Sequence, residues 1–148
     1  MDDITIKCEI PSVDAYRNLR RAVDWPTPVP EVVGSALKNV LCGFIVEKKS
    51  DIIGMATVIG DGFLFFYIQD VIIHPDHQRQ GIGTNLMEAV MAYINSRAAP
   101  KAYIALFSAK GLEPFYKRYG FIERPTDRFG AGMFFIKGLD LENDFKRS

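Results

Sequence analysis

The sequence predicts a single α/β domain with a mixed sheet, and three observations support that prediction. Its 148 residues, of which 48% are hydrophobic and 24% charged, have the composition of one ordinary globular domain. Alternating or continuous apolar runs indicate strands, and apolar residues that recur every three or four positions indicate helices. We therefore expect one domain over residues 1–148, with its elements in the order β-α-α-β-β-β-α-β-α-β-β.

The first third of the chain contains one predicted strand and two predicted helices. Residues 4–10 alternate between apolar and polar side chains, which predicts a half-buried strand. Ser12 can cap the first helix, and Pro30 is well placed to begin the second. Between them lies a proline-rich loop, residues 24–30, that carries the only tryptophan, Trp25. The apolar stripe of the first helix comprises Val13, Tyr16, Leu19 or Arg20, and Val23.

The middle of the chain is rich in strand-forming residues. Residues 41–47 and 52–59 are predicted strands joined by a polar turn. A tight Gly-Asp-Gly turn at residues 60–62 leads to a long apolar segment, residues 63–73. Such a segment is typical of a strand that is buried on both faces.

The rest of the chain, from Ile82 onward, contains two predicted helices and three predicted strands. Apolar residues recur at helical spacing from Ile82 until Pro100 ends the segment. Residues 101–107 form the next predicted strand, and residues 121–123 and 133–137 form the last two. A short helix precedes these last two strands, and its apolar face comprises Leu112, Phe115, Tyr116 and Tyr119.

Charge and composition exclude several classes of protein. The 18 basic and 18 acidic residues give a formal net charge of zero, without the basic excess of a nucleic-acid binder. The longest apolar runs have six residues, whereas a bilayer span needs about 20. The acidic N-terminus does not resemble a signal peptide. We expect no nucleic-acid partner, no membrane partner and a cytoplasmic location.

The cysteines do not predict a metal site. Cys8 and Cys42 lie in apolar stretches, so we expect free, buried thiols, as is usual in a reducing compartment. The sequence has no CxxC motif and no close cluster of His and Cys residues. We therefore expect no metal.

The most informative segment is the polar loop that joins the strand at residues 63–73 to the helix that begins at Ile82. Gly81 and Gly83 at its end allow the backbone to approach a ligand closely. The first turn of a helix has unpaired N–H groups and the positive end of the helix dipole. This segment is therefore suited to bind a phosphate or pyrophosphate.

Three phosphate-binding motifs can be compared with this segment. A Walker loop requires a lysine after its last glycine, and neither Gly81 nor Gly83 is followed by one. A dinucleotide fingerprint requires a third glycine, and Leu86 stands at that position. The third pattern fits, because Gln78, Gly81 and Gly83 form Gln-x-x-Gly-x-Gly. It resembles the pyrophosphate loop of the GNAT superfamily of acyl-CoA-dependent N-acyltransferases.

Two further motifs extend this resemblance over essentially the whole chain. Ile73-x-Pro75 looks like the Val-x-Pro strand end of the family. Residues 115–121, Phe-Tyr-Lys-Arg-Tyr-Gly-Phe, look like its Phe-Tyr-x-x-x-Gly-Phe motif. Two features depart from the family pattern. Gln78 takes a position more often held by Arg, and the Asn usually found before the Phe-Tyr helix is missing.

The resemblance implies a GNAT-like fold whose two central strands splay apart to hold acetyl-CoA as a co-substrate. Three backbone N–H groups would hold the pantetheine arm and polarise the thioester carbonyl: those of Val71, Ile72 and Ile73. The loop and the helix start would hold the pyrophosphate through Gln78, Arg79, Gln80, Gly81, Ile82, Gly83 and Thr84. Phe115 and Tyr116 complete the predicted acetyl-CoA site.

The resemblance also implies that a primary amine attacks the thioester directly in a ternary complex. Tyr116 would protonate the departing thiolate or donate a hydrogen bond to it. Asp70 is the best-placed carboxylate to assist deprotonation of the amine, and a structural hydrogen bond inside the sheet is the equal alternative. Trp25 and Gln69 are the candidate substrate-binding residues.

The sequence therefore predicts a single N-acetyltransferase domain that moves an acetyl group from acetyl-CoA to a primary amine. Its aromatic content favours a small or hydrophobic amine over a polycation. Two alternatives stay open, a non-catalytic acyl-CoA-binding domain and a protein or peptide N-acetyltransferase. A homodimer is compatible with the sequence.

Overall fold

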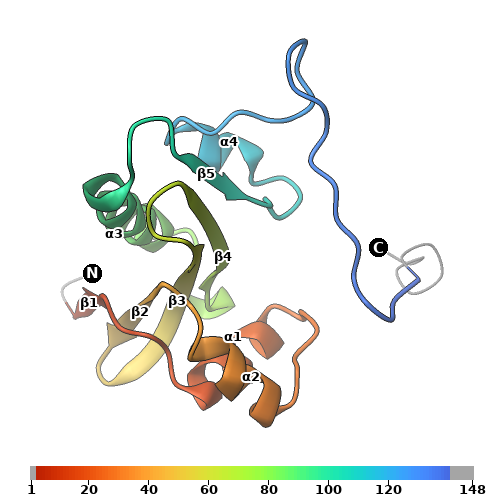
Figure 1. The fold of residues 1–148 in the computed structure, drawn as a ribbon. Helices are drawn as coiled ribbons and strands as arrows, with labels where there is room; N and C mark the ends of the chain where they lie inside the picture. The colour runs from red at the N-terminus through yellow and green to blue at the C-terminus, as the bar shows by residue number, and fades with distance from the viewer. Residues whose placement is uncertain (1–2, 141–148) are drawn as a thin grey trace. The chain divides into compact units, whose positions relative to one another are not determined.

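The computed structural model describes residues 3–140, which contain a five-stranded mixed sheet with helices on both sides (Figure 1). The strands lie in the sheet in chain order, and all neighbours are antiparallel except the last pair, which is parallel. The fold class predicted from the sequence is confirmed. The strands are β1 (Ile4–Lys7), β2 (Cys42–Lys48), β3 (Asp51–Gly60), β4 (Phe65–Ile73) and β5 (Tyr103–Leu106).

The helices begin where the sequence predicts. The Ser12 hydroxyl accepts a hydrogen bond from the Ala15 N–H at 3.1 Å and so caps the first helix, and Pro30 begins the second. The helices are α1 (Val13–Ala22), α2 (Pro30–Leu37), the short 3-10 helix η1 (Pro75–His77), α3 (Ile82–Arg97) and α4 (Glu113–Lys117). Helices α1 and α2 lie on one side of the sheet and α3 lies on the other (Figure 1).

Apolar side chains pack on both faces of the sheet. On the side of α1, Leu19 packs with Met55 and Ile72. On the side of α3, the rings of Phe44 and Tyr93 meet edge to face with their centroids 6.0 Å apart. The face of α3 that is buried comprises Ile82, Leu86, Met87, Val90 and Ile94. This packing on both sides fixes the central strands.

Strand β4 begins two residues later than predicted, because the preceding turn takes up its first N–H groups. The Asp61 carboxylate accepts hydrogen bonds from Phe63, Leu64 and Phe65 at 2.8, 2.8 and 3.0 Å. These bonds favour the charged form and lower the pKa of Asp61. The expectation that the strand is buried on both faces is wrong, because only alternate residues of β4 are buried and Phe65 is 58% exposed.

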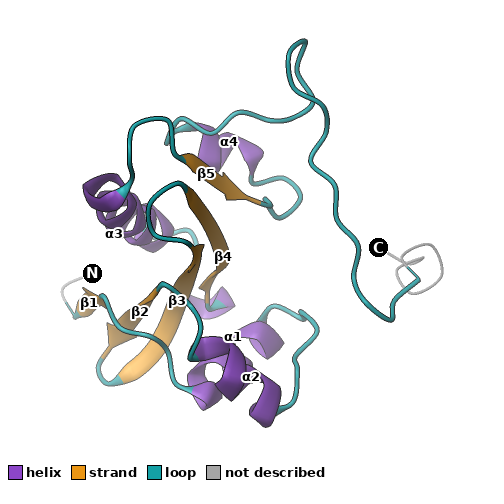
Figure 2. Cartoon of the chain, in the orientation of Figure 1, coloured by secondary structure: helices purple, strands orange, loops and turns teal. Residues whose placement is uncertain are grey.

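The described residues form two compact units, one that ends at Ser108 and one that begins at Ala109. The second unit contains α4 and a long stretch of loop (Figure 2). The strands predicted at residues 121–123 and 133–137 are wrong, because neither segment pairs with a strand in the described part of the chain. Phe135, for example, is 87% exposed. A single N-acetyltransferase domain over residues 1–148 stays a prediction.

Both cysteines are free, but only one is buried. Cys42 lies inside β2, and burial raises the pKa of its thiol to about 11. Cys8 follows the end of β1 and is exposed, so the prediction of a buried thiol is wrong for Cys8.

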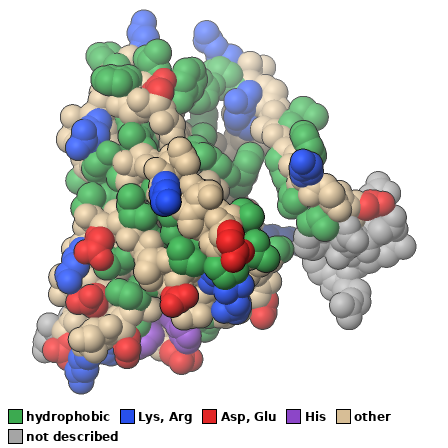
Figure 3. All heavy atoms as spheres, turned by 60° about the horizontal axis from the view of Figure 1, so that its bottom comes forward, with side chains coloured by type: hydrophobic (Ala, Val, Ile, Leu, Met, Phe, Trp, Pro, Cys, Tyr) green, Lys and Arg blue, Asp and Glu red, His purple; other side chains and the backbone are tan. Residues whose placement is uncertain are grey.

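Charged side chains of both signs are interspersed on the face of the molecule shown in Figure 3. Within residues 3–140, no helix is long and apolar enough to cross a bilayer. No group of His, Cys, Asp and Glu side chains in these residues is arranged to hold a metal ion. The cytoplasmic location and the homodimer stay predictions.

Candidate active site

A β-bulge in β4 determines where the polar residues of this strand point. Between two paired positions, β3 contributes residues 55–57 while β4 contributes the longer segment 69–72, so Asp70 and Val71 together face one residue of β3. Asp70 has a φ of +55°, in the left-handed region that residues with a side chain seldom adopt. The bulge breaks the alternation of the strand between Gln69 and Ile72. Asp70 and Ile72 both face α1, where they contact Tyr16 and Leu19 respectively.

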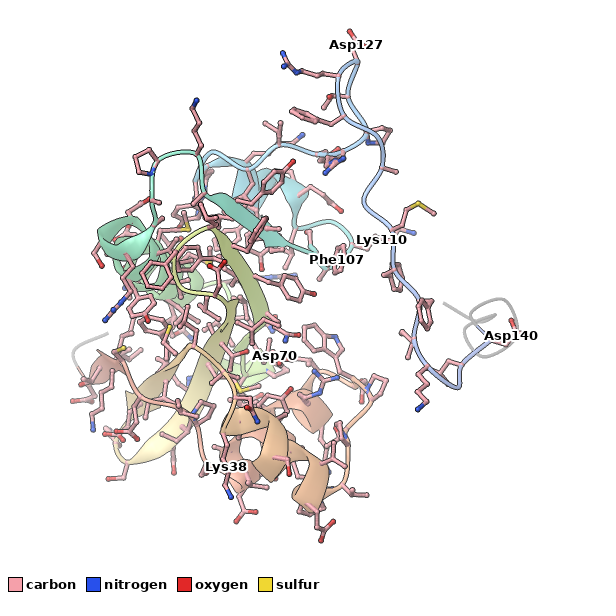
Figure 4. All side chains as sticks on the ribbon, viewed as in Figure 1. Lys38, Asp70, Phe107, Lys110, Asp127 and Asp140 are labelled. Carbon is pink, nitrogen blue, oxygen red and sulfur yellow. The ribbon has the colours of Figure 1, made fainter. Side chains whose placement is uncertain are left out.

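Two side chains of α1 hold the Asp70 carboxylate. The Tyr16 hydroxyl donates to Oδ2 at 2.7 Å, and Arg20 Nη1 forms an ion pair with Oδ1. Asp70 is only 7% exposed and lies on β4 next to α1 (Figure 4). Burial of Tyr16 and the nearby charge of Asp70 raise the pKa of Tyr16 well above its usual value. The Tyr16 phenol therefore stays protonated and donates to Asp70.

Arg20 extends these contacts to the proline-rich loop. Its Nε and Nη2 donate to the carbonyl oxygen of Pro26 at 2.9 and 2.7 Å. Its guanidinium carbon lies 5.5 Å from the ring centroid of Trp25 and 5.7 Å from that of Tyr16. Trp25, a predicted substrate-binding residue, is therefore held against α1 and connected to Asp70 through one side chain.

The pairing of β4 with β5 ends before β4 does. The last paired residues are Ile68 and Leu106, and residues 69–73 have no strand on their β5 side in the described part of the chain. Phe107 follows directly after β5 (Figure 4), and its ring meets that of Tyr67 edge to face at 5.6 Å. β5 itself ends at Leu106, so β4 extends beyond the paired stretch, in the region where the sequence predicts the two strands to splay. The backbone of residues 69–73, which includes Gln69 and the predicted N–H donors, is where an extended ligand with amide groups can bind.

The loop after β4 is anchored at the strand and open at the helix. The Gln78 side-chain amide donates to the carbonyl oxygen of Ile73 at 2.8 Å, which joins the loop to the end of β4. Arg79 and Gly81 have positive φ angles of +64° and +82°, and both are exposed together with Gln80. A Cβ at Gly81 would meet no atom within 4 Å, so the space beside it is open.

Helix α3 begins without a side-chain cap. Gly81 is its N-cap residue, and its first turn contains no acidic side chain. Ile82 is buried and anchors this turn in the core, while Gly83 and Thr84 are half-buried. A helix of 16 residues that starts in this way presents N–H groups and a positive dipole end to an anion. The geometry suits a pyrophosphate.

Tyr116 lies in α4, in the second unit, and is 7% exposed. Its ring meets Phe115 and Phe121 edge to face, with centroids 5.0 and 6.4 Å apart. Burial raises the pKa of Tyr116, because the interior disfavours a phenolate. The side chain is therefore a neutral hydrogen-bond donor at physiological pH.

Sequence reasoning did not identify two residues of this site, Tyr16 and Arg20. The signal for them was an arginine on the apolar stripe of α1, where a buried cation requires an anionic partner. That partner, Asp70, lies on β4, far away in the sequence. The structure thus brings Asp70 and Trp25 together through residues that local patterns did not single out.

The model of the acetyltransferase (GNAT) domain family matches residues 35–137, which is more than half of the chain. The chain belongs to this family. The uncharacterized N-acetyltransferase ycf52 of Pyropia yezoensis is 32% identical over 108 residues, which cover 70% of this chain and 61% of that protein. The chain spans less than two thirds of the length of this and two further ycf52 relatives.

Solved structures extend the GNAT similarity to nearly the whole chain. Protein SA2161 of Staphylococcus aureus, described as a probable acetyltransferase, is 28% identical with a TM-score of 0.81, and the match covers 90% of this chain and 98% of that one. The GNAT family acetyltransferase SP0256 of Streptococcus pneumoniae is 28% identical with a TM-score of 0.73, covering 92% and 99%. The family predicted from the three sequence motifs is confirmed.

Proposed function

We propose that this GNAT domain transfers an acetyl group from acetyl-CoA to a primary amine by direct attack of the amine on the thioester. The observation that carries the proposal is the uncapped start of α3, which follows a stretch of β4 that extends beyond its pairing with β5. These two neighbouring features offer N–H donors to a pyrophosphate and to an arm with amide groups. Acetyl-CoA contains both groups and supplies the acetyl group as an activated thioester.

The chain would bind acetyl-CoA mainly through its backbone. The side chains of Ile72 and Ile82 are buried in the core, so these residues can reach a ligand only through main-chain atoms. We assign the N–H groups of residues 71–73 to the pantetheine arm and the thioester carbonyl, where they would stabilise developing negative charge. We assign residues 78–84 to the pyrophosphate, and Phe115 to the acetyl-CoA site beside Tyr116.

The transfer step needs one hydrogen-bond donor at sulfur. The amine nitrogen forms a bond to the carbonyl carbon, the carbon–sulfur bond breaks, and CoA leaves with the electron pair as a thiolate. The amine loses one proton and the thiolate gains one, so an amide and a thiol are the products. Tyr116, a neutral phenol, donates its hydrogen toward the sulfur as charge builds there.

The amine has to be neutral when it attacks. An alkylamine with a pKa of about 10.4 is neutral in only about one molecule in 2,500 at pH 7. An apolar surrounding lowers the pKa of an amine, because burial disfavours the ammonium form. On the first unit, Trp25 and the pair formed by Tyr67 and Phe107 would offer apolar surfaces of this kind, which favours a small amine with an apolar part.

A thiol-release assay with acetyl-CoA tests the proposal. The acceptor panel comprises an arylalkylamine, a linear polyamine and a peptide with a free N-terminus. We expect thiol release with the arylalkylamine above the rate without acceptor. Release only with the peptide would assign a peptide N-acetyltransferase. Stabilisation of the protein by acetyl-CoA without release from any acceptor would assign a non-catalytic acyl-CoA-binding domain.

A further inference from the structure

We infer that Tyr16, Arg20 and Asp70 are positioning residues for acetyl transfer, because together they tie the bulge of β4 to the loop that carries Trp25. The contacts are independent of any activity, whereas their role in acetyl transfer rests on the proposed function. In this role Asp70 holds its neighbours in place and does not act as the base that deprotonates the amine.

The surroundings of Asp70 suit a carboxylate that holds its neighbours. One oxygen accepts from the Tyr16 phenol and the other from the Arg20 guanidinium, and the side chain is 5% exposed. A buried network in which each polar group has a partner fixes geometry, because breaking any one contact leaves a buried charge or dipole unsatisfied. The positive φ of Asp70 sits at the bulge itself, so these bonds also hold the backbone at Val71.

Arg20 uses all three nitrogens of its guanidinium. Nη1 binds Asp70, while Nε and Nη2 converge on the Pro26 carbonyl. The guanidinium carbon also lies over the rings of Tyr16 and Trp25. A lysine offers no planar fork of this kind, so Arg20→Lys keeps the charge but loses the geometry.

Further contacts fix the loop to α1 at the same place. The backbone N–H of Trp25 donates to the Arg20 carbonyl at 3.0 Å, and the Thr27 hydroxyl donates to the Trp25 carbonyl at 3.0 Å. Arg17 Nε donates to the Pro28 carbonyl at 2.9 Å. The position of Trp25 therefore depends on Arg20, and the orientation of Arg20 depends on Asp70, which is 50 residues away in the chain.

The network of Tyr16, Arg20 and Asp70 thus holds two parts of the proposed site in place. Asp70 holds the bulge whose N–H groups face the thioester in our proposal, and Arg20 holds the tryptophan on the acceptor side. A change at Asp70 is expected to move Trp25, although the two side chains share no direct bond among the described contacts. This coupling is the specific consequence that an experiment can detect.

Trp25 is the only tryptophan of the chain, so its fluorescence reports on the loop directly. We compare Asp70→Asn, Arg20→Lys and Tyr16→Phe with the control Arg21→Lys, whose side chain is exposed and outside the network. Asn tolerates the left-handed backbone, so Asp70→Asn keeps the bulge while it removes the charge. We expect red-shifted emission and stronger acrylamide quenching in Asp70→Asn and Arg20→Lys, a smaller change in Tyr16→Phe, and none in Arg21→Lys.

The kinetic readout separates positioning from deprotonation. Arg20→Lys is expected to raise KM for the amine about tenfold, the effect of losing one hydrogen bond to a charged group, with acetyl-CoA affinity nearly unchanged. Asp70→Asn is expected to lower kcat/KM while the shape of its pH profile stays that of the wild type. Loss of the pH-dependent rise in Asp70→Asn would make Asp70 the base and overturn the inference.

The fluorescence readout does not require turnover. If the wild type transfers no acetyl group, the proposed function fails while the coupling of Asp70 to Trp25 is still measured. If Asp70→Asn and Tyr16→Phe both fold and both leave Trp25 emission and quenching unchanged, the coupling is absent and the inference is wrong.

Discussion

Replacing Tyr116 by Phe removes one hydroxyl group and leaves the ring. The edge-to-face contacts with Phe115 and Phe121, at 5.0 and 6.4 Å, involve only the ring, so a phenylalanine can keep them. The melting temperature is therefore expected to change little. Any large effect of this substitution on the rate reports on the hydroxyl itself.

The expected loss of rate follows from the pKa values of the donor and the acceptor. A phenol has a pKa of about 10 and a thiol of about 8.5, so full proton transfer to the thiolate is uphill by about 2 kcal/mol. Burial raises the pKa of Tyr116 and makes the transfer still less favourable. The phenol therefore acts by donating a hydrogen bond as charge builds on sulfur. Loss of this interaction should lower kcat by about 10²–10⁴ with little change in KM for acetyl-CoA.

Initial rates of thiol release at saturating acetyl-CoA and amine measure this effect. Tyr119→Phe is the matched control, because Tyr119 lies just after α4 and its ring meets Phe115 edge to face at 5.7 Å. We expect Tyr119→Phe to cost little in rate. If the two variants lose activity equally, or if Tyr116→Phe keeps most of its activity, the role assigned to Tyr116 is wrong.

Three further predictions concern the ligand, the acceptor and the stability of the fold. A hundredfold excess of acetyl-CoA over Kd should stabilise the protein by about 2.7 kcal/mol in thermal unfolding, whereas NAD and ATP should not. Gly83→Glu should abolish that shift without lowering the melting temperature of the free protein, because a carboxylate is favourable in the first turn of a helix; equal stabilisation by NAD would overturn the assignment of the loop. The wild-type kcat/KM should rise from about pH 6 to about pH 8.5 as the amine loses its proton, and a flat profile would contradict attack by a neutral amine. Hydrogen bonds from backbone N–H groups lower the pKa of Asp61 in the folded protein. The stabilisation that this carboxylate contributes is therefore complete above the unfolded-state pKa of about 3.9. It is lost as the pH falls through the folded-state pKa. Asp61→Ala should therefore lower the melting temperature at pH 7, and the difference from the wild type should shrink toward pH ~3; a difference that stays constant would show that the charge contributes nothing.

Local signals predicted the elements that depend on local interactions. A hydroxyl at Ser12 can cap a helix in any fold, and the fixed φ of Pro30 favours a helix start wherever it lies. Asp61 shows the limit of this reasoning, because its carboxylate holds three N–H groups that the apolar pattern assigns to β4. The start of β4 was therefore predicted two residues too early, whereas its end at Ile73 was predicted correctly.

The features that the sequence did not reveal depend on partners distant in the chain. An apolar run such as residues 133–137 shows only that a segment fits a pleated sheet, and a strand forms only where another strand pairs with it. The bulge at Asp70 likewise arises from the register between β3 and β4, which no single strand encodes. The contacts of Tyr16 and Arg20 with Asp70 follow from that bulge. The sequence pattern identified Asp70 as a candidate, but its contacts with Tyr16 and Arg20 become apparent only in the fold.

The most direct test of acetyl transfer in a ternary complex measures both products and the protein in a single turnover. The acetyl-CoA complex is mixed with excess amine, and CoA, the N-acetylated amine and the intact mass of the protein are followed by mass spectrometry. Direct attack predicts equal amounts of CoA and N-acetylated amine, no CoA release without amine, and no acetylated protein at any time. CoA release in the absence of amine together with an acetylated protein would contradict direct transfer, and the absence of acetylated amine would contradict the activity itself.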